Sequence, residues 1–138
     1  MADYSGRALW QKIGFKPGYQ FMVINKPLDY DALVAGMSAE CKEVQDGESL
    51  DLIHFFADSE EELRVLLPAF RRKIKSNGMI WVSWPKKASG VDTDLSGDVV
   101  RRCGLGLDLV DVKVCAVDET WSGLKFVIPK SMRVENQK

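Results

Sequence analysis

Two long apolar segments constrain the fold of this chain more than any other feature. Residues 50–57 read LDLIHFFA and residues 79–84 read MIWVSW, and both are apolar at nearly every position. A strand with one face in water alternates apolar and polar residues, whereas a strand of a parallel sheet is covered on both faces. The two segments are therefore predicted to be buried, central strands. Pro85 ends the second one, because proline has no backbone N–H to donate to a neighbouring strand.

The segment between these strands carries the strongest helix signals in the chain. Ser59 and Glu62 form the pattern of a capping box, three glutamates favour the positive end of a helix dipole, and Gly78 stands just past the expected end. Apolar residues recur at helical spacing at Leu63, Leu66, Leu67, Phe70 and Ile74. A strand, a helix and a strand in this order predict a right-handed crossover between parallel strands.

The remaining segments continue the alternation of strands and helices. Helices are predicted for residues 5–13, with Ser5 as the cap, for the residues after Asp29, and for those after Asp94. Strands are predicted at residues 20–25, 41–44, 110–116 and 124–128; the alternating valines of 110–116 predict one buried face. The short connection to the last strand predicts an antiparallel pair. The fold class is thus α/β, a small doubly wound, mostly parallel sheet with an antiparallel C-terminal edge strand.

Length and composition are those of one domain. The chain has 138 residues, 46% of them hydrophobic, so we expect a single α/β domain over residues 1–130 and a flexible tail over residues 131–138. The formal net charge is -1, and the basic residues of 71–75 suit the negative end of a helix, so no nucleic-acid partner is expected. No apolar run reaches the roughly 18 residues of a membrane span, and no signal peptide is recognised, which predicts a cytoplasmic protein without a membrane partner.

The cysteines and the only histidine argue against two familiar kinds of site. Cys41, Cys103 and Cys115 are odd in number and lack the spacing of a zinc site, so neither a disulfide scaffold nor a metal is predicted. Residues 92–97 echo half of a calcium loop without its later glutamate. Asp92, Asp94 and Asp98 argue against phosphate at the start of the following helix. His54 lies in an apolar strand and is predicted to be a hydrogen-bonded core residue rather than a general base.

Polar side chains follow the predicted parallel strands at their carboxyl ends, where open α/β sheets bind ligands. We call this set the candidate rim: Asn25, Lys26, Trp84, Lys86, Lys87, Ser89, Asp118, Glu119, Trp121 and Ser122. Two lysines facing two carboxylates beside an indole ring suit a small anionic or zwitterionic ligand, or could lower a lysine pKa for catalysis. Alternatively, the lysines pair with the carboxylates and only fasten the loops. Trp121 is the tryptophan expected to meet a ligand, while Trp81 and Trp84 are expected in the core.

The order of these segments resembles the frame of a class I, Rossmann-like methyltransferase dependent on S-adenosylmethionine. The likeness rests on the turn 16–18, LDLIHFF, a helix ending in KSNG, MIWVSWP and a final hairpin. Such enzymes follow their first strand with a glycine-rich turn that lets the cofactor approach the backbone. Here that turn reads NKPLDY, without glycine, and one middle strand is absent. The resemblance therefore implies a truncated frame without its cofactor site; no cofactor and no catalytic residues are predicted.

A second resemblance is to an uncharacterised bacterial family, the domain-of-unknown-function 3052 family. It rests on WVSWPKKASGV, TDL and LDLVDVKVCAVDETWSGLKFV, and it implies no reaction. Three functions are open at this point. The leading hypothesis is a non-catalytic, small-ligand-binding or regulatory module. The others are an enzyme that uses Lys86 or Lys87 with Asp118 or Glu119 on a small anionic substrate, and a structural or partner-binding protein.

Overall fold

A six-stranded sheet forms the centre of the protein, with the strand order β2-β1-β3-β4-β6-β5. The computed structural model describes residues 8–133. The strands are β1 Gln20–Ile24, β2 Lys42–Glu43, β3 Leu50–Phe56, β4 Ile74–Pro85, β5 Val110–Ala116 and β6 Trp121–Val127. The helices are α1 Leu9–Ile13, α2 Tyr30–Leu33, α3 Glu60–Lys73 and α4 Gly97–Leu105, with 3-10 turns at Lys87–Ser89 and Lys130–Met132. The predicted cap Ser5 lies outside the described residues.

The direction of the strands confirms the predicted fold class. β2, β1, β3 and β4 are parallel neighbours, and β6 runs antiparallel between β4 and β5. The antiparallel pairing is therefore at the C-terminal end of the sheet, with β5 as its outer strand. β5 runs in the direction of β4, so the ends of β1, β3, β4 and β5 and the start of β6 share one edge.

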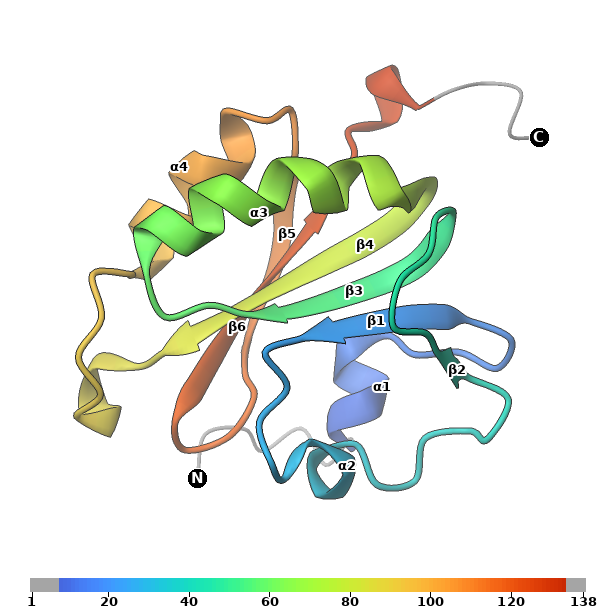
Figure 1. Ribbon diagram of the computed structural model, residues 1–138, viewed down its shortest axis with the longest axis horizontal. Coiled ribbons are helices and arrows are strands. Elements are labelled where there is room, and N and C mark those ends of the chain that lie inside the picture. Colours follow the sequence, from blue (N-terminus) through green and yellow to red (C-terminus); the bar gives the residue numbers. More distant parts are fainter. Residues whose placement is uncertain (1–7, 134–138) are drawn as a thin grey trace.

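Helices cover the sheet on both faces (Figure 1). α3 and α4 lie on one face, and α1 and α2 lie on the other. Each face has its own apolar cluster: Leu63, Leu67 and Val100 belong to the first, whereas Ile13, Tyr30 and Trp81 belong to the second. The sheet is therefore buried from both sides, which is why β3 and the second half of β4 are apolar at nearly every position.

The expected end of the α3 helix was wrong. The helix ends at Lys73, and Ile74 is already extended and begins β4. Ile74 pairs with Leu50 of β3, so it is buried as a strand residue and not as part of the helical stripe. Gly78 lies inside β4, where a Cβ atom would stand 2.9 Å from the carbonyl oxygen of Leu50. Glycine is required there by close approach of the backbones, rather than as a helix stop.

The predicted buried face of β5 was also wrong. Val112 and Val114 are 53% and 61% exposed, while Asp111, Lys113 and Cys115 are half-buried. The pairing with β6 shifts its register between Asp111 and Lys113, as at a β-bulge. Alternation along a strand divides its residues between two faces, but it does not say which face of this outer strand the rest of the protein covers.

Candidate functional site

A cavity of about 590 Å³ opens where β4 ends, on the shared edge of the sheet. Its lining comes from the end of β4, the loop that leads to α4, and the first residues of α4 and β6: Trp84, Pro85, Lys86, Lys87, Gly90, Val91, Asp92, Thr93, Leu95, Ser96, Gly97 and Ser122. Small-molecule sites commonly have volumes of roughly 300–1,000 Å³. The cavity is thus of a size that suits a small ligand, and we call it the β4 cavity.

An indole ring forms the apolar part of the β4 cavity. Trp84 is 7% exposed, which confirms its predicted place in the core, and it lines the cavity as well. A Cβ atom at Gly97 would lie 3.7 Å from Cζ2 of Trp84, so the ring sits against the start of α4. Pro85, Val91 and Leu95 add further apolar surface.

Three charged side chains line the β4 cavity: Lys86, Lys87 and Asp92. Within residues 8–133, none of the three makes a side-chain hydrogen bond or an ion pair within 4.0 Å. The alternative in which the lysines pair with Asp118 or Glu119 is therefore not what the described chain shows. Both lysines are free to meet a ligand.

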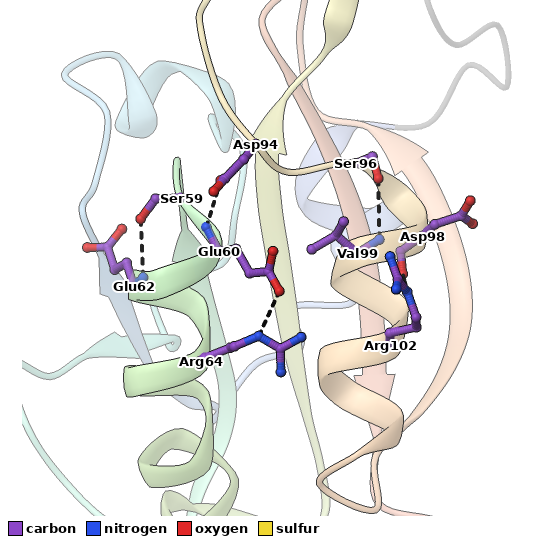
Figure 2. Close-up of polar contacts among 9 residues, drawn as sticks. All are labelled: Ser59, Glu60, Glu62, Arg64, Asp94, Ser96, Asp98, Val99 and Arg102. Carbon is purple, nitrogen blue, oxygen red and sulfur yellow. Dashed lines mark hydrogen bonds and ion pairs between the residues drawn. The ribbon is translucent and has the colours of Figure 1, made fainter.

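Hydrogen bonds hold the loop that forms the cavity wall (Figure 2). The Thr93 hydroxyl donates to the carbonyl oxygen of Asp58 at 2.7 Å, and an Asp94 carboxylate oxygen accepts from the backbone N–H of Glu60 at 2.8 Å. Asp94 thus caps α3 rather than the helix that follows it in the sequence. The Ser96 hydroxyl caps α4 instead, by accepting from the N–H of Val99 at 3.3 Å.

This arrangement changes the expected charge at the start of α4. Asp94 is turned toward α3, and the carboxylate of Asp98 pairs with Arg101 at 3.1 Å. Asp92 is therefore the one aspartate of the predicted group that lines the cavity. Asp98 does lie in the first turn of α4, as expected, whereas Asp94 serves the start of α3 instead.

The rim residues after β1 serve to fasten neighbouring segments. The side-chain amide of Asn25 donates to the carbonyl oxygen of Phe56 at 3.0 Å and to the carboxylate of Glu62 at 2.8 Å. Lys26 forms an ion pair with Glu43 at 2.8 Å. Only half of the predicted capping box is present, since Ser59 accepts from the N–H of Glu62 while the Glu62 carboxylate binds Asn25.

The rim residues before β6 are engaged in a turn. An Asp118 carboxylate oxygen accepts from the backbone N–H groups of Thr120 and Trp121, both at 2.8 Å. The Trp121 ring packs edge-on against Phe56, with ring centroids 5.0 Å apart. Glu119 is exposed.

Four members of the candidate rim come together in the β4 cavity: Trp84, Lys86, Lys87 and Ser122. Ser89 lies in the adjoining 3-10 turn, where its hydroxyl donates to the carbonyl oxygen of Lys86 at 2.6 Å. Sequence reasoning missed Asp92, Val91 and Leu95 as lining residues. Their only signal was a position in the same loop, between Pro85 and the next helix.

His54 belongs to a buried chain of polar groups away from the β4 cavity. Its Nδ1 lies 3.0 Å from the Tyr30 hydroxyl oxygen and its Nε2 lies 2.8 Å from the Ser83 hydroxyl oxygen. The ring is fully buried, and this burial lowers the pKa of His54 to about 3. Burial also raises the pKa of the Tyr30 hydroxyl. The prediction of a hydrogen-bonded core histidine is confirmed.

The turn after β1 does not fit a cofactor that approaches the backbone through glycine. Asn25 has a positive φ of 59° without being glycine, and its side-chain N–H groups donate to Phe56 and Glu62. The ammonium of Lys26 lies 5.7 Å from the centroid of the Tyr30 ring, which is buried beneath the turn. Within residues 8–133, no cluster of three or more His, Cys, Asp or Glu side chains could hold a metal ion. In the same range, no helix is long and apolar enough to cross a membrane.

Comparison with known proteins places the fold among methyltransferases. Neither a family model nor a curated protein matches the sequence. Among solved structures, a SAM (S-adenosylmethionine) dependent methyltransferase from Aquifex aeolicus matches with a TM-score of 0.63 and 12% identity, over 88% of both chains. A methyltransferase from Pyrococcus furiosus matches with a TM-score of 0.60 and 15% identity, over 86% of this chain and 79% of that one. A TehB-like SAM-dependent methyltransferase from Corynebacterium glutamicum has a TM-score of 0.55 and 11% identity, over 88% and 85%.

The structural similarity to these proteins shows the fold, but sequence identities this low do not show the activity. The protein has a Rossmann-like, methyltransferase-like α/β fold, as its sequence predicted. The comparisons do not show membership in the domain-of-unknown-function 3052 family.

Proposed function

We propose that this protein binds a small anionic or zwitterionic molecule in the β4 cavity, as a non-catalytic binding or regulatory module on a methyltransferase-like frame. The observation that carries this proposal is the pair of lysines beside Trp84, neither of which has a counter-ion within the described residues. Two uncompensated ammonium groups beside buried aromatic surface favour an anion with an apolar part. Membership in the domain-of-unknown-function 3052 family and a cytoplasmic location remain predictions.

Methyl transfer is the second candidate function. The solved neighbours support it, because their titles name SAM-dependent methyltransferases. The turn after β1 argues against methyl transfer, because the side-chain N–H groups of Asn25 and the ammonium group of Lys26 already bind other residues of the chain. A methyltransferase built on this chain would have to hold its cofactor without a glycine-rich turn.

A thermal-shift screen tests the leading proposal. The compounds are nucleotides, sugar phosphates, amino acids, S-adenosylmethionine and its demethylated product. A ligand at a hundred times its dissociation constant stabilises a protein by about 2.7 kcal/mol, which is easily seen in a domain of this size. The shift should be lost in Lys86→Ala and Lys87→Ala and retained in Lys42→Ala, an exposed lysine of β2 at the other end of the sheet.

The outcomes separate the leading proposal from its three alternatives. No shift with any compound would contradict the proposal and favour the partner-binding alternative. A shift with S-adenosylmethionine, followed by release of its demethylated product on incubation with acceptor compounds, would favour methyl transfer. Turnover of a small anion that is lost in Lys86→Ala would favour the lysine-dependent enzyme.

A further inference from the structure

The polar groups of the β4 cavity divide into engaged and free ones. The hydroxyls of Thr93 and Ser96 are engaged, the first with the Asp58 carbonyl and the second with the N–H of Val99. The free groups include the ammonium groups of Lys86 and Lys87, the carboxylate of Asp92 and the hydroxyl of Ser122, none of which has a polar side-chain contact within residues 8–133. The cavity therefore offers charges of both signs.

These opposite charges line the same cavity without pairing with each other. No ammonium nitrogen of Lys86 or Lys87 lies within 4.0 Å of a carboxylate oxygen of Asp92. A simple anion would gain the attraction of the lysines but would also meet the repulsion of Asp92. A ligand that carries both a negative and a positive group would be attracted by all three side chains.

The rest of the free surface in the β4 cavity is apolar. Trp84 and Pro85 come from the end of β4, and Val91 and Leu95 come from the loop. Val91 is 48% exposed, although it is a large apolar side chain at the cavity. Such surface is best covered by an apolar part of the ligand.

We propose that the ligand is a small zwitterion with an apolar body, the chemical class to which free apolar amino acids belong. Its carboxylate lies between Lys86 and Lys87, its ammonium group faces Asp92, and its apolar part covers Trp84 and Val91. This inference rests on the proposed function, since it names the class of molecule that the β4 cavity takes.

Isothermal titration with a matched set of compounds tests the ligand class. L-phenylalanine and L-leucine carry all three features. 3-phenylpropanoate lacks the ammonium group, 2-phenylethylamine lacks the carboxylate, and L-alanine lacks the large apolar body. We expect at least one of the first two to bind ten-fold or more tightly than each of the last three. The inference would be overturned if any one of the three incomplete compounds bound as tightly as the complete ones, or if neither L-phenylalanine nor L-leucine bound.

Substitutions then assign each charge. In Asp92→Asn, the affinity for the complete amino acid should fall about ten-fold, while 3-phenylpropanoate should bind as well as before or better. In Lys86→Ala combined with Lys87→Ala, both compounds should lose at least ten-fold. Lys42→Ala is the matched control and should bind as the unaltered protein does. Unchanged binding to Asp92→Asn would overturn the role of Asp92, and the unliganded melting temperature of that variant verifies that it folds.

Failure of the ligand class and failure of the proposed function give different results. If another compound of the thermal-shift screen binds in a manner dependent on Lys86, but the amino acids do not, only the ligand class is wrong. If nothing in the screen binds, both proposals are wrong.

Discussion

At the scale of single residues, His54 is the clearest case of a sequence position whose environment sets its chemistry. The ring is buried on the face of the sheet that holds Tyr30, where it contacts the hydroxyls of Tyr30 and Ser83, so it stays neutral in the folded protein. The same ring stacks on Phe56, with ring centroids 4.3 Å apart. In the structure it joins two buried hydroxyls without carrying a charge.

We predict that this histidine makes the folded state sensitive to mild acid. The pKa of His54 is about 3 in the folded protein, well below the 6.5 of an exposed histidine. Above pH 6.5, His54 is neutral in both the folded and the unfolded protein. Between pH 6.5 and about pH 3, the unfolded protein carries a proton on His54 that the folded protein does not. The free energy of unfolding should therefore fall by about 1.4 kcal/mol for each pH unit below 6.5. Urea denaturation between pH 7.5 and pH 5 measures this slope.

The His54→Phe variant provides the control for the acid sensitivity. It should be less stable at pH 7.5, because the hydroxyls of Tyr30 and Ser83 each lose a buried partner, at a cost of roughly 1–3 kcal/mol per group. Between pH 6.5 and pH 5 its stability should change much less than that of the unaltered protein. Equal slopes in the two proteins would show that other groups cause the acid sensitivity.

At the scale of elements, the start of α3 depends on a residue that is distant in the sequence. Ser59, the residue just before the helix, caps the N–H of Glu62, and Asp94 caps the N–H of Glu60 from the loop after β4 (Figure 2). Two of the unpaired N–H groups of this helix end are thus satisfied, one of them by the cavity wall. The stability of α3 and the position of that wall are consequently linked.

We predict that Asp94→Ala lowers the free energy of unfolding by about 1 kcal/mol, which is typical of a lost helix cap. Asp92→Ala is the matched control two residues earlier, and it should leave the stability nearly unchanged because Asp92 makes no polar side-chain contact within the described residues. Chemical denaturation of both variants at pH 7 is the measurement. A larger loss in Asp92→Ala than in Asp94→Ala would contradict this assignment of the cap.

Elements were predictable where a local pattern decides them. The continuous apolar runs of β3 and β4 and the cap at Ser59 needed no knowledge of the rest of the chain. Asp94 was assigned to the wrong helix, because a side chain near two helix starts can cap either of them and sequence distance favours the nearer one. The exposed valines of β5 show the same limit, since strand alternation defines two faces without saying which is covered.

At the scale of the whole molecule, the sequence predicted the class of the fold and the edge of the sheet at which the β4 cavity opens. The alternation of strands and helices specified a mostly parallel sheet, and the rule that ligands bind at its carboxyl edge led to Lys86 and Lys87. The sequence could not specify the lining of the β4 cavity, because the loop between β4 and α4 is held by contacts of Thr93 and Asp94 with residues distant in the sequence. Trp121 was the tryptophan expected to meet a ligand, but it packs on Phe56, and Trp84 lines the β4 cavity instead.

The last prediction concerns whether the two faces of the sheet unfold together. α4 approaches β6 so closely that a Cβ atom at Gly104 would overlap the buried ring of Phe126. Gly104→Ala should therefore cost roughly 1–3 kcal/mol by overpacking, although alanine is the better helix former. Gly106→Ala is the control, because its Cβ atom would have no neighbour closer than 3.5 Å.

Native-state hydrogen exchange measures how far the loss of stability in Gly104→Ala extends through the protein. Gly104 perturbs the apolar cluster under α3 and α4, whereas Phe21 of β1 belongs to the cluster on the opposite face. If the sheet and both clusters form one cooperative domain, backbone amides of β1 and of β3 should lose the same free energy of protection as the whole protein loses in denaturation. Unchanged protection of β1 beside weakened protection of β6 would show two separately unfolding parts and would contradict the predicted single domain.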